Sequence, residues 1–162
     1  MGKAGNTRWR ERIVRFAPVV VWVLVIFFLS SSQGSMSKTS LFVRPLLEFL
    51  FPAADEVTLQ IYHGHIRKAA HVTEYAVLAF LASRAFFTSA RPFLKKYWWL
   101  LALVTVAAVA ATDEFNQSFN TARTGTPWDV GIDLVGGLVG TALWALADRF
   151  RGRIATRRSS RL

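Results

Sequence analysis

Long apolar runs separated by short polar and basic segments dominate the chain. Four runs are long enough to cross a bilayer as helices, and we expect spans at about residues 16–31, 66–87, 97–113 and 129–148. At 1.5 Å per residue, the fourth run covers about 27 Å, close to the thickness of a hydrocarbon core. The pattern therefore predicts an all-α integral membrane bundle of about four transmembrane helices, formed as a single domain over residues 1–162.

The first run, FAPVVVWVLVIFFLS, follows a basic segment, as the apolar part of a signal peptide also does. The residues after it, SSSQGSMSK, do not form a small-residue cleavage site. We therefore expect an uncleaved anchor. Pro18 is expected in the first turn of its helix, where the missing N–H costs little.

The segment between the first and second runs has a mixed pattern. Within residues 34–65, the stretch LFVRPLLEFLF places Arg44 and Glu48 four residues apart with a proline between them. These charges argue against a full span and favour an interfacial or re-entrant segment. His63 and His65 follow in a stretch that we expect to be unstructured. Two histidines at this spacing match no tight metal motif, so no metal site is predicted.

Composition supports the membrane class and excludes several others. Apolar residues make up 52% of the chain, and its average hydropathy is positive. Cysteine is absent, which excludes a disulfide framework, a thiolate metal site and a cysteine nucleophile. The net charge of +10 does not predict nucleic-acid binding, because the basic residues gather at the chain ends and between the second and third runs.

The same basic residues predict an orientation. With four spans, the N-terminal segment, the loop carrying Arg91, Lys95 and Lys96, and the basic tail at 149–162 all fall on one side. By the positive-inside rule that side is cytoplasmic, so we expect a multi-pass cell-membrane protein with both termini in the cytoplasm. Residues 31–70 and 113–128 then face outward together.

Polar side chains cluster where the second span begins, in the stretch RKAAHVTEYAVLAF. Helical spacings of three and four residues bring Arg67, Lys68, His71, Glu74 and Tyr75 near one another. Ionisable side chains at the end of a span must pair, reach the surface or line a wet cavity. Histidine titrates near neutral pH, so His71 is the natural proton donor or acceptor, with structural pairing and ligand binding as the alternatives.

A second polar cluster joins the third and fourth runs. Glu114 and Gln117, with Asp113, follow the third run, and one further helical turn would bring them together. Asp129 and Asp133 lie one turn apart in the fourth run. Asp129 sits where a carboxylate favours the helix dipole, whereas the deeper Asp133 should be buried against a donor. Arg123, in the loop between the runs, is a candidate cation for these acids.

Glycines follow in the same run. Gly136 and Gly140 stand four apart, with Gly137 between them, and this stripe lets another helix approach closely. We interpret the three glycines as packing positions, and an oligomer is compatible with them. Ser30, Ser31 and Ser32 end the first run without a nucleophile elbow around them, so they are expected to form hydrogen bonds at the end of the helix.

Three blocks of this chain resemble the VanZ-like family of small bacterial membrane proteins: FFLSSSQ, RKAAHVTEYAVLAF and DEFNQSFNTARTGTPWDVGIDLVGGLVG. The resemblance implies a polytopic envelope protein and, for some members, lowered sensitivity to teicoplanin-type antibiotics. It implies no reaction. The family pattern falls on Ser31, Gln33, Lys68, His71, Glu74, Tyr75, Glu114, Gln117, Arg123, Asp129, Asp133 and Gly136.

Three functions fit these residues, and none of them requires a cofactor. In the first, the outer site binds an anionic membrane lipid, a lipid phosphate or a cell-wall precursor: Arg67, Lys68 and Arg123 donate to it, and Tyr75 and Gln117 orient it. In the second, His71 is the general acid/base of an enzyme acting on a lipid-linked phosphate or ester, oriented by Glu74 or Glu114. In the third, the acids and histidine relay protons in a small transporter.

Overall fold

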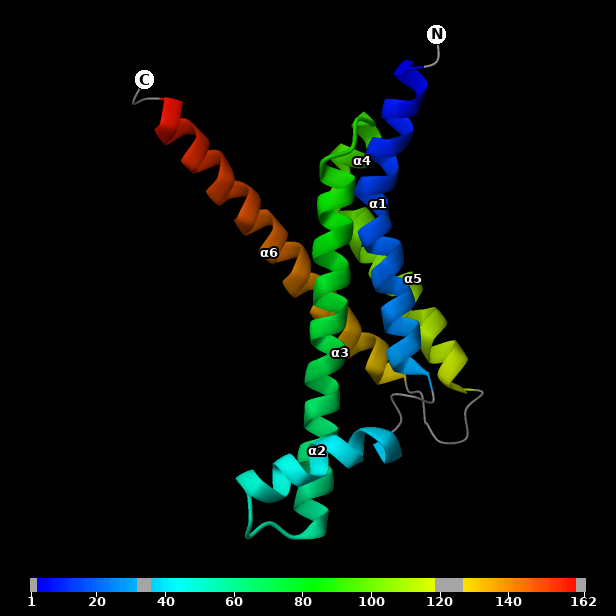
Figure 1. Cartoon of the computed structure of the whole chain (residues 1–162), viewed down its shortest axis with the longest axis vertical. Helices are drawn as coiled ribbons and strands as arrows, with labels where there is room; N and C mark the ends of the chain where they lie inside the picture. Colours follow the sequence, from blue (N-terminus) through cyan, green and yellow to red (C-terminus); the bar gives the residue numbers. More distant parts are fainter. Residues whose placement is uncertain (1–2, 32–35, 119–126, 160–162) are drawn as a thin grey trace.

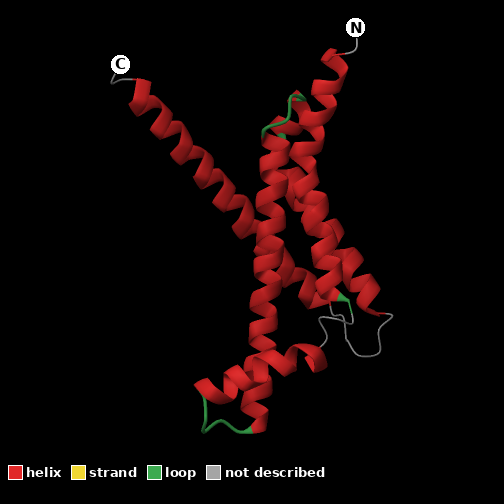
Figure 2. Ribbon diagram, in the orientation of Figure 1, coloured by secondary structure: helices red, strands yellow, loops and turns green. Residues whose placement is uncertain are grey.

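The computed structural model describes residues 3–31, 36–118 and 127–159, and every element in these ranges is an α-helix. The six helices are α1 (Lys3–Ser30), α2 (Met36–Leu50), α3 (Glu56–Phe87), α4 (Pro92–Lys96), α5 (Trp98–Ser118) and α6 (Pro127–Ser159). Figure 2 shows helix over nearly all of the described residues and no strand among them. The predicted all-α fold is confirmed.

The long helix α3 is the centre of the arrangement. It packs against α6, α5 and α1 along its length and against α2 near its beginning. Figure 1 shows α2 crossing α3 at one end of the molecule, while α4, the start of α1 and the end of α6 lie toward the other. The second half of α6 leans away from α3, so α6 packs on it mainly through its first half.

Three of the helices are long and apolar enough to cross a membrane: Trp9–Ser30, Trp98–Gln117 and Trp128–Gly152. They correspond to the first, third and fourth predicted spans. The remaining predicted span, residues 66–87, is the second part of α3. Its polar residues, among them Arg67, Lys68 and Glu74, lower its average hydropathy.

Helix α3 begins at Glu56, ten residues before the predicted start of the second span. Its N-terminus is capped by Asp55, whose carboxylate accepts a 2.9 Å hydrogen bond from the backbone N–H of Thr58. His63 and His65 therefore lie within a helix rather than in an unstructured stretch. At 1.5 Å per residue, α3 is about 48 Å long, well beyond the ~30 Å of a hydrocarbon core.

Other helices also extend beyond the predicted membrane spans. Helix α5 runs five residues past 113, to Ser118, and α6 continues through most of the basic tail, to Ser159. Helix α1 begins at Lys3, so Pro18 lies in its interior and not in its first turn. Periodicity located the apolar centre of each helix. Each helix continues into the polar segments beside that centre because helical hydrogen bonding propagates at little cost once begun.

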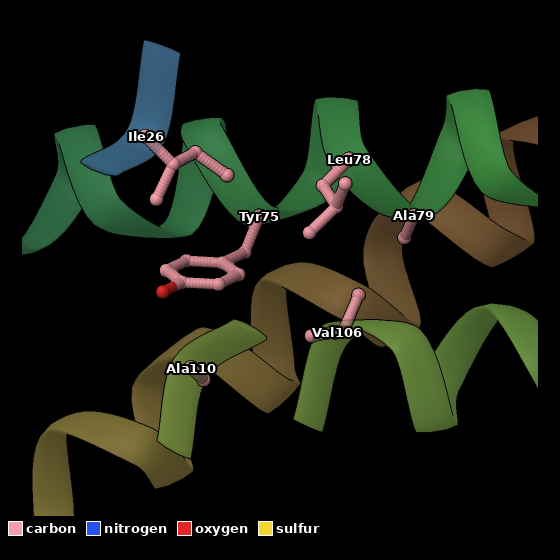
Figure 3. Close-up of a cluster of buried hydrophobic side chains, with 6 residues drawn as sticks. All are labelled: Ile26, Tyr75, Leu78, Ala79, Val106 and Ala110. Carbon is pink, nitrogen blue, oxygen red and sulfur yellow. The ribbon is translucent and has the colours of Figure 1, made fainter. Parts of the chain in front are cut away.

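A small apolar core fills the space between α1, α3, α5 and α6. Its six buried side chains are Ile26, Tyr75, Leu78, Ala79, Val106 and Ala110. Figure 3 shows the Tyr75 ring between the ribbons, with its hydroxyl oxygen on the side away from Leu78 and Ala79. The alanines keep the helices close, and Tyr75 carries the one polar atom into this group of side chains.

The contact between α3 and α6 depends on glycine. A Cβ built on Gly136 would overlap the carbonyl oxygen of Val72, and one built on Gly140 would overlap that of Ala76. A Cβ on Gly137 would come within 2.9 Å of a methyl group of Val106 in α5. The two helices thus touch backbone to backbone, as small residues allow in membranes.

Candidate functional site

A buried hydrogen-bonded group joins the end of α1 to the end of α5. Ser30 Oγ donates a 2.6 Å hydrogen bond to Asp113 Oδ2, and Gln117 Nε2 donates a 2.9 Å bond to the same oxygen. All three residues are buried. Because α5 continues past residue 113, Asp113 and Gln117 lie one turn apart on one face, which is what lets Gln117 reach back to the carboxylate.

A second polar pair lies between α3 and α6. His71 Nδ1 is 3.6 Å from Asp133 Oδ1, and the Asp133 side chain is only 1% exposed. The glycine contact sets this geometry. Gly136 lies against Val72. Asp133, three positions before Gly136, therefore faces His71, the residue just before Val72. The expectation that Asp133 is buried beside a possible donor agrees with this placement.

Tyr75 extends the polar region into the core. It lies one turn after His71, with ring centroids 6.5 Å apart and planes within 13° of parallel. Its side chain is fully buried, and its hydroxyl has no hydrogen-bond partner within the described part of the chain. Buried hydroxyls are nearly always hydrogen-bonded in native proteins, so the Tyr75 hydroxyl is an exception within the described residues.

The remaining predicted acids surround this pair at less depth. Glu74, Glu114 and Asp129 are half-buried, and with Asp113 they are the charges that act on Asp133. The backbone carbonyl of Glu74 also accepts a 2.8 Å hydrogen bond from Trp22 Nε1, which fastens α1 to α3. Acidic side chains from α3, α5 and α6 thus gather around one point, and we call Ser30, His71, Tyr75, Asp113, Gln117 and Asp133 the polar centre.

The predicted cations lie farther out along α3. Arg67 is half-buried and Lys68 is exposed, three to four residues before His71. Arg123 and Gln33 lie outside the described residues. The structure thus brings the acids, His71, Tyr75 and Gln117 together inside the bundle and leaves Lys68 at its surface, rather than collecting all of the predicted residues in one place.

Two members of the polar centre, Ser30 and Asp113, were named in the sequence analysis, as a hydrogen bonder at a helix end and as a member of the second polar cluster, but neither was predicted to bind a ligand or to act in catalysis. Each had a signal in the sequence: Ser30 ends an apolar run, and Asp113 precedes Gln117 by one turn. Periodicity alone does not predict that α1 and α5 end at the same height in the bundle. Ser31, by contrast, turns its hydroxyl back to the carbonyl of Phe28 at 2.6 Å.

No group of three or more His, Asp or Glu side chains in the described ranges is placed to hold a metal ion. His63, from the His63-Gly64-His65 stretch, is buried and its Nε2 lies 3.1 Å from the Thr39 hydroxyl on α2. It thus takes part in the contact between α2 and α3.

A family model described as VanZ/LLP1 matches residues 16–148, which is most of the chain. The match begins in α1 and ends in α6, so it contains every residue of the polar centre. Comparisons with curated proteins and with solved structures give no match.

Proposed function

The chain belongs to the VanZ/LLP1 family, and on this premise we propose that it is a polytopic cell-envelope protein whose polar centre binds a phosphate-bearing lipid or cell-wall component from the outer side. The observation that carries the proposal is that the Tyr75 hydroxyl and Asp133 Oδ1, two of the buried polar atoms without a hydrogen-bond partner among the described residues, both lie in the polar centre. Leaving such atoms unsatisfied lowers stability, which favours a functional reason for them.

The proposed topology has four spans, with α3 as the second. The start of α1, the short α4 and the end of α6 lie toward one end of the molecule, and all three are basic. Positive charge gathered at one end supports a cytoplasmic position for that end and for both termini. The polar centre, formed where α1 and α5 end, then lies in the outer half of the bundle.

The ligand class follows from the order of charges along α3. Lys68 and Arg67 stand at the entrance, about 5 Å along the axis before His71, where they can donate charge-assisted hydrogen bonds to a phosphate. Deeper in, the carboxylates and the Tyr75 hydroxyl suit the hydroxyl or amino groups of a headgroup. A lipid phosphate and a lipid-linked cell-wall precursor share this chemistry.

Lipid retention by a charge-neutralised variant tests the proposal. Lys68→Gln and the control Arg84→Gln remove one exposed cation each, from opposite ends of the proposed span in α3. We expect Lys68→Gln to retain about tenfold less phosphate-bearing lipid through purification, since a bond to a charged group contributes about 1.5–3 kcal/mol. Equal retention by the two variants would reject the site. The identity of the lipid that the wild type retains distinguishes a lipid phosphate from a cell-wall precursor.

The cell-wall alternative has its own test in cells. If the polar centre binds a lipid-linked precursor, expressing the chain in a susceptible bacterium should lower its sensitivity to a teicoplanin-type antibiotic, and Lys68→Gln should remove the effect. Unchanged sensitivity together with intact lipid retention would favour the plain lipid phosphate.

The contact between His71 and Asp133 favours a second candidate function, a membrane enzyme. A carboxylate 3.6 Å from an imidazole can orient it and stabilise its protonated form, as a general acid/base requires. Water would be the nucleophile on a lipid-linked phosphate or ester. Hydrolysis of such a lipid by wild type but not by His71→Gln would establish this candidate, and equal hydrolysis by the two would exclude it.

A further inference from the structure

A cleft separate from the polar centre lies where α2 crosses α3. It has a volume of about 350 Å³ and is lined by Ser40, Arg44, Leu47, Glu56, Leu59, Gln60 and His63. Two of these side chains, Leu47 and Leu59, form a buried apolar base. Its volume is within the range of small-ligand sites, and it is large enough for one lipid headgroup.

Arg44 is held at the cleft by two carboxylates. Arg44 Nε donates to Glu48 at 2.8 Å, and its two terminal nitrogens donate to Glu56 at 2.6 and 3.2 Å. Arg44 thus uses three of its five N–H groups and keeps two for another acceptor. Of these three charged groups, Arg44 and Glu56 line the cleft, so it presents one cation beside one carboxylate and suits a ligand with an ammonium close to a phosphate.

The position of α2 matches the headgroup layer of a bilayer. This step rests on the topology proposed above, in which α3 enters the hydrocarbon near residue 66. His63 then lies about 5 Å beyond that edge, inside a headgroup layer about 5–8 Å thick, and Leu59 lies about 11 Å beyond it, just past the outer side of that layer. The polar side of α2 faces α3 at this height.

The other side of α2 is apolar and exposed. Phe42 and Phe49 are each 82% exposed, and Leu41 is 71% exposed. A helix with exposed aromatic and aliphatic side chains at the headgroup level buries them at the boundary with the acyl chains. A lipid in the cleft would therefore have its headgroup between α2 and α3, and its chains would continue along apolar surface.

We propose that the cleft between α2 and α3 binds the headgroup of a zwitterionic aminophospholipid, with its ammonium on Glu56 and its phosphate on Arg44. An ethanolamine ammonium carries three N–H donors for the carboxylate, whereas a choline ammonium carries none. The cleft thus distinguishes two headgroups that have the same net charge.

Native mass spectrometry of the full chain, purified with an equal mixture of phosphatidylethanolamine and phosphatidylcholine, tests this proposal. We expect the wild type to retain the ethanolamine lipid about tenfold more than the choline lipid. Glu56→Gln should abolish the preference. Glu11→Gln, which removes an exposed carboxylate from α1, should keep it. Equal retention of the two lipids by the wild type would overturn the proposal, and so would a preference that survives in Glu56→Gln.

Failure of the cleft proposal and failure of the polar-centre proposal give different lipid-retention results. Lys68→Gln changes a contact with phosphate, which both lipids share, so it should lower total retention without changing the ratio of ethanolamine to choline lipid. Loss of the ratio in Lys68→Gln but not in Glu56→Gln would place the selective site at the polar centre and reject the cleft.

Discussion

Ser30 and Asp113, which are 83 residues apart in the chain, share a 2.6 Å hydrogen bond between the ends of α1 and α5. Both side chains are buried, and the carboxylate is only 2% exposed. A carboxylate inside a membrane bundle is costly unless donors surround it. Ser30 and Gln117 provide two donors, so this part of the polar centre is satisfied within the protein and is expected to stabilise it.

Replacing Ser30 with alanine should therefore destabilise the chain. After the change, Gln117 still donates to Asp113, but the bond from Ser30 is lost. The free energy of unfolding should fall by about 1–3 kcal/mol. Denaturant unfolding in mild detergent would measure it. Ser31→Ala is the matched control, because the Ser31 hydroxyl donates to the backbone carbonyl of Phe28 in its own helix, and it should change stability by less than about 0.5 kcal/mol. Equal effects at the two serines would contradict the assignment.

The glycine contact predicts a sharp difference between two positions of α6. Gly140→Ala places a methyl group against the backbone of Ala76, which no side-chain rotation can relieve, and should destabilise the chain by about 1–3 kcal/mol. Gly131→Ala meets nothing within 4 Å and should be neutral, or more stable by up to about 1 kcal/mol because alanine favours helix. Thermal unfolding of both variants in detergent would decide; a Gly140→Ala variant as stable as Gly131→Ala would disprove the close contact.

The contact between α2 and α3 should weaken in acid. Burial, and then the charge of Arg67, lowers the pKa of His63 below its ordinary 6.5. The folded chain therefore favours neutral His63, and this stabilising contribution is present above pH 6.5 and lost as the pH falls toward the lowered pKa. Unfolding midpoints at about pH 7.5 and 5.5 should differ less in His63→Gln than in wild type. His65→Gln, which removes an exposed imidazole two residues on, should behave as wild type. A smaller difference between the two midpoints in His65→Gln than in His63→Gln would refute the role of His63.

Much of the fold follows from the apolar pattern. The end of α3 at Phe87, the helical break before Pro92 and the apolar centres of α1, α5 and α6 are all readable from the sequence, because lipid requires continuous helices of a minimum length. The early start of α3 was missed. It depends on a cap at Asp55 and on packing against α2, and neither leaves a clear hydrophobic period.

The polar centre was readable in part. Spacings within one helix correctly related His71 to Tyr75 and Asp113 to Gln117, since each pair is one turn apart. Contacts between helices, such as Ser30 with Asp113, depend on where each helix ends and how closely α3 approaches α6. The glycines predicted a close approach, but the partner helix and the register come only from the structure.

Tyr75→Phe tests the central proposal most directly, because it removes only the buried hydroxyl that has no partner among the described residues. If that hydroxyl is kept for a ligand, the variant should unfold at the same midpoint as wild type or higher, while its retention of phosphate-bearing lipid falls. A lower unfolding midpoint with unchanged lipid retention would contradict the proposal and assign Tyr75 to the structural core alone.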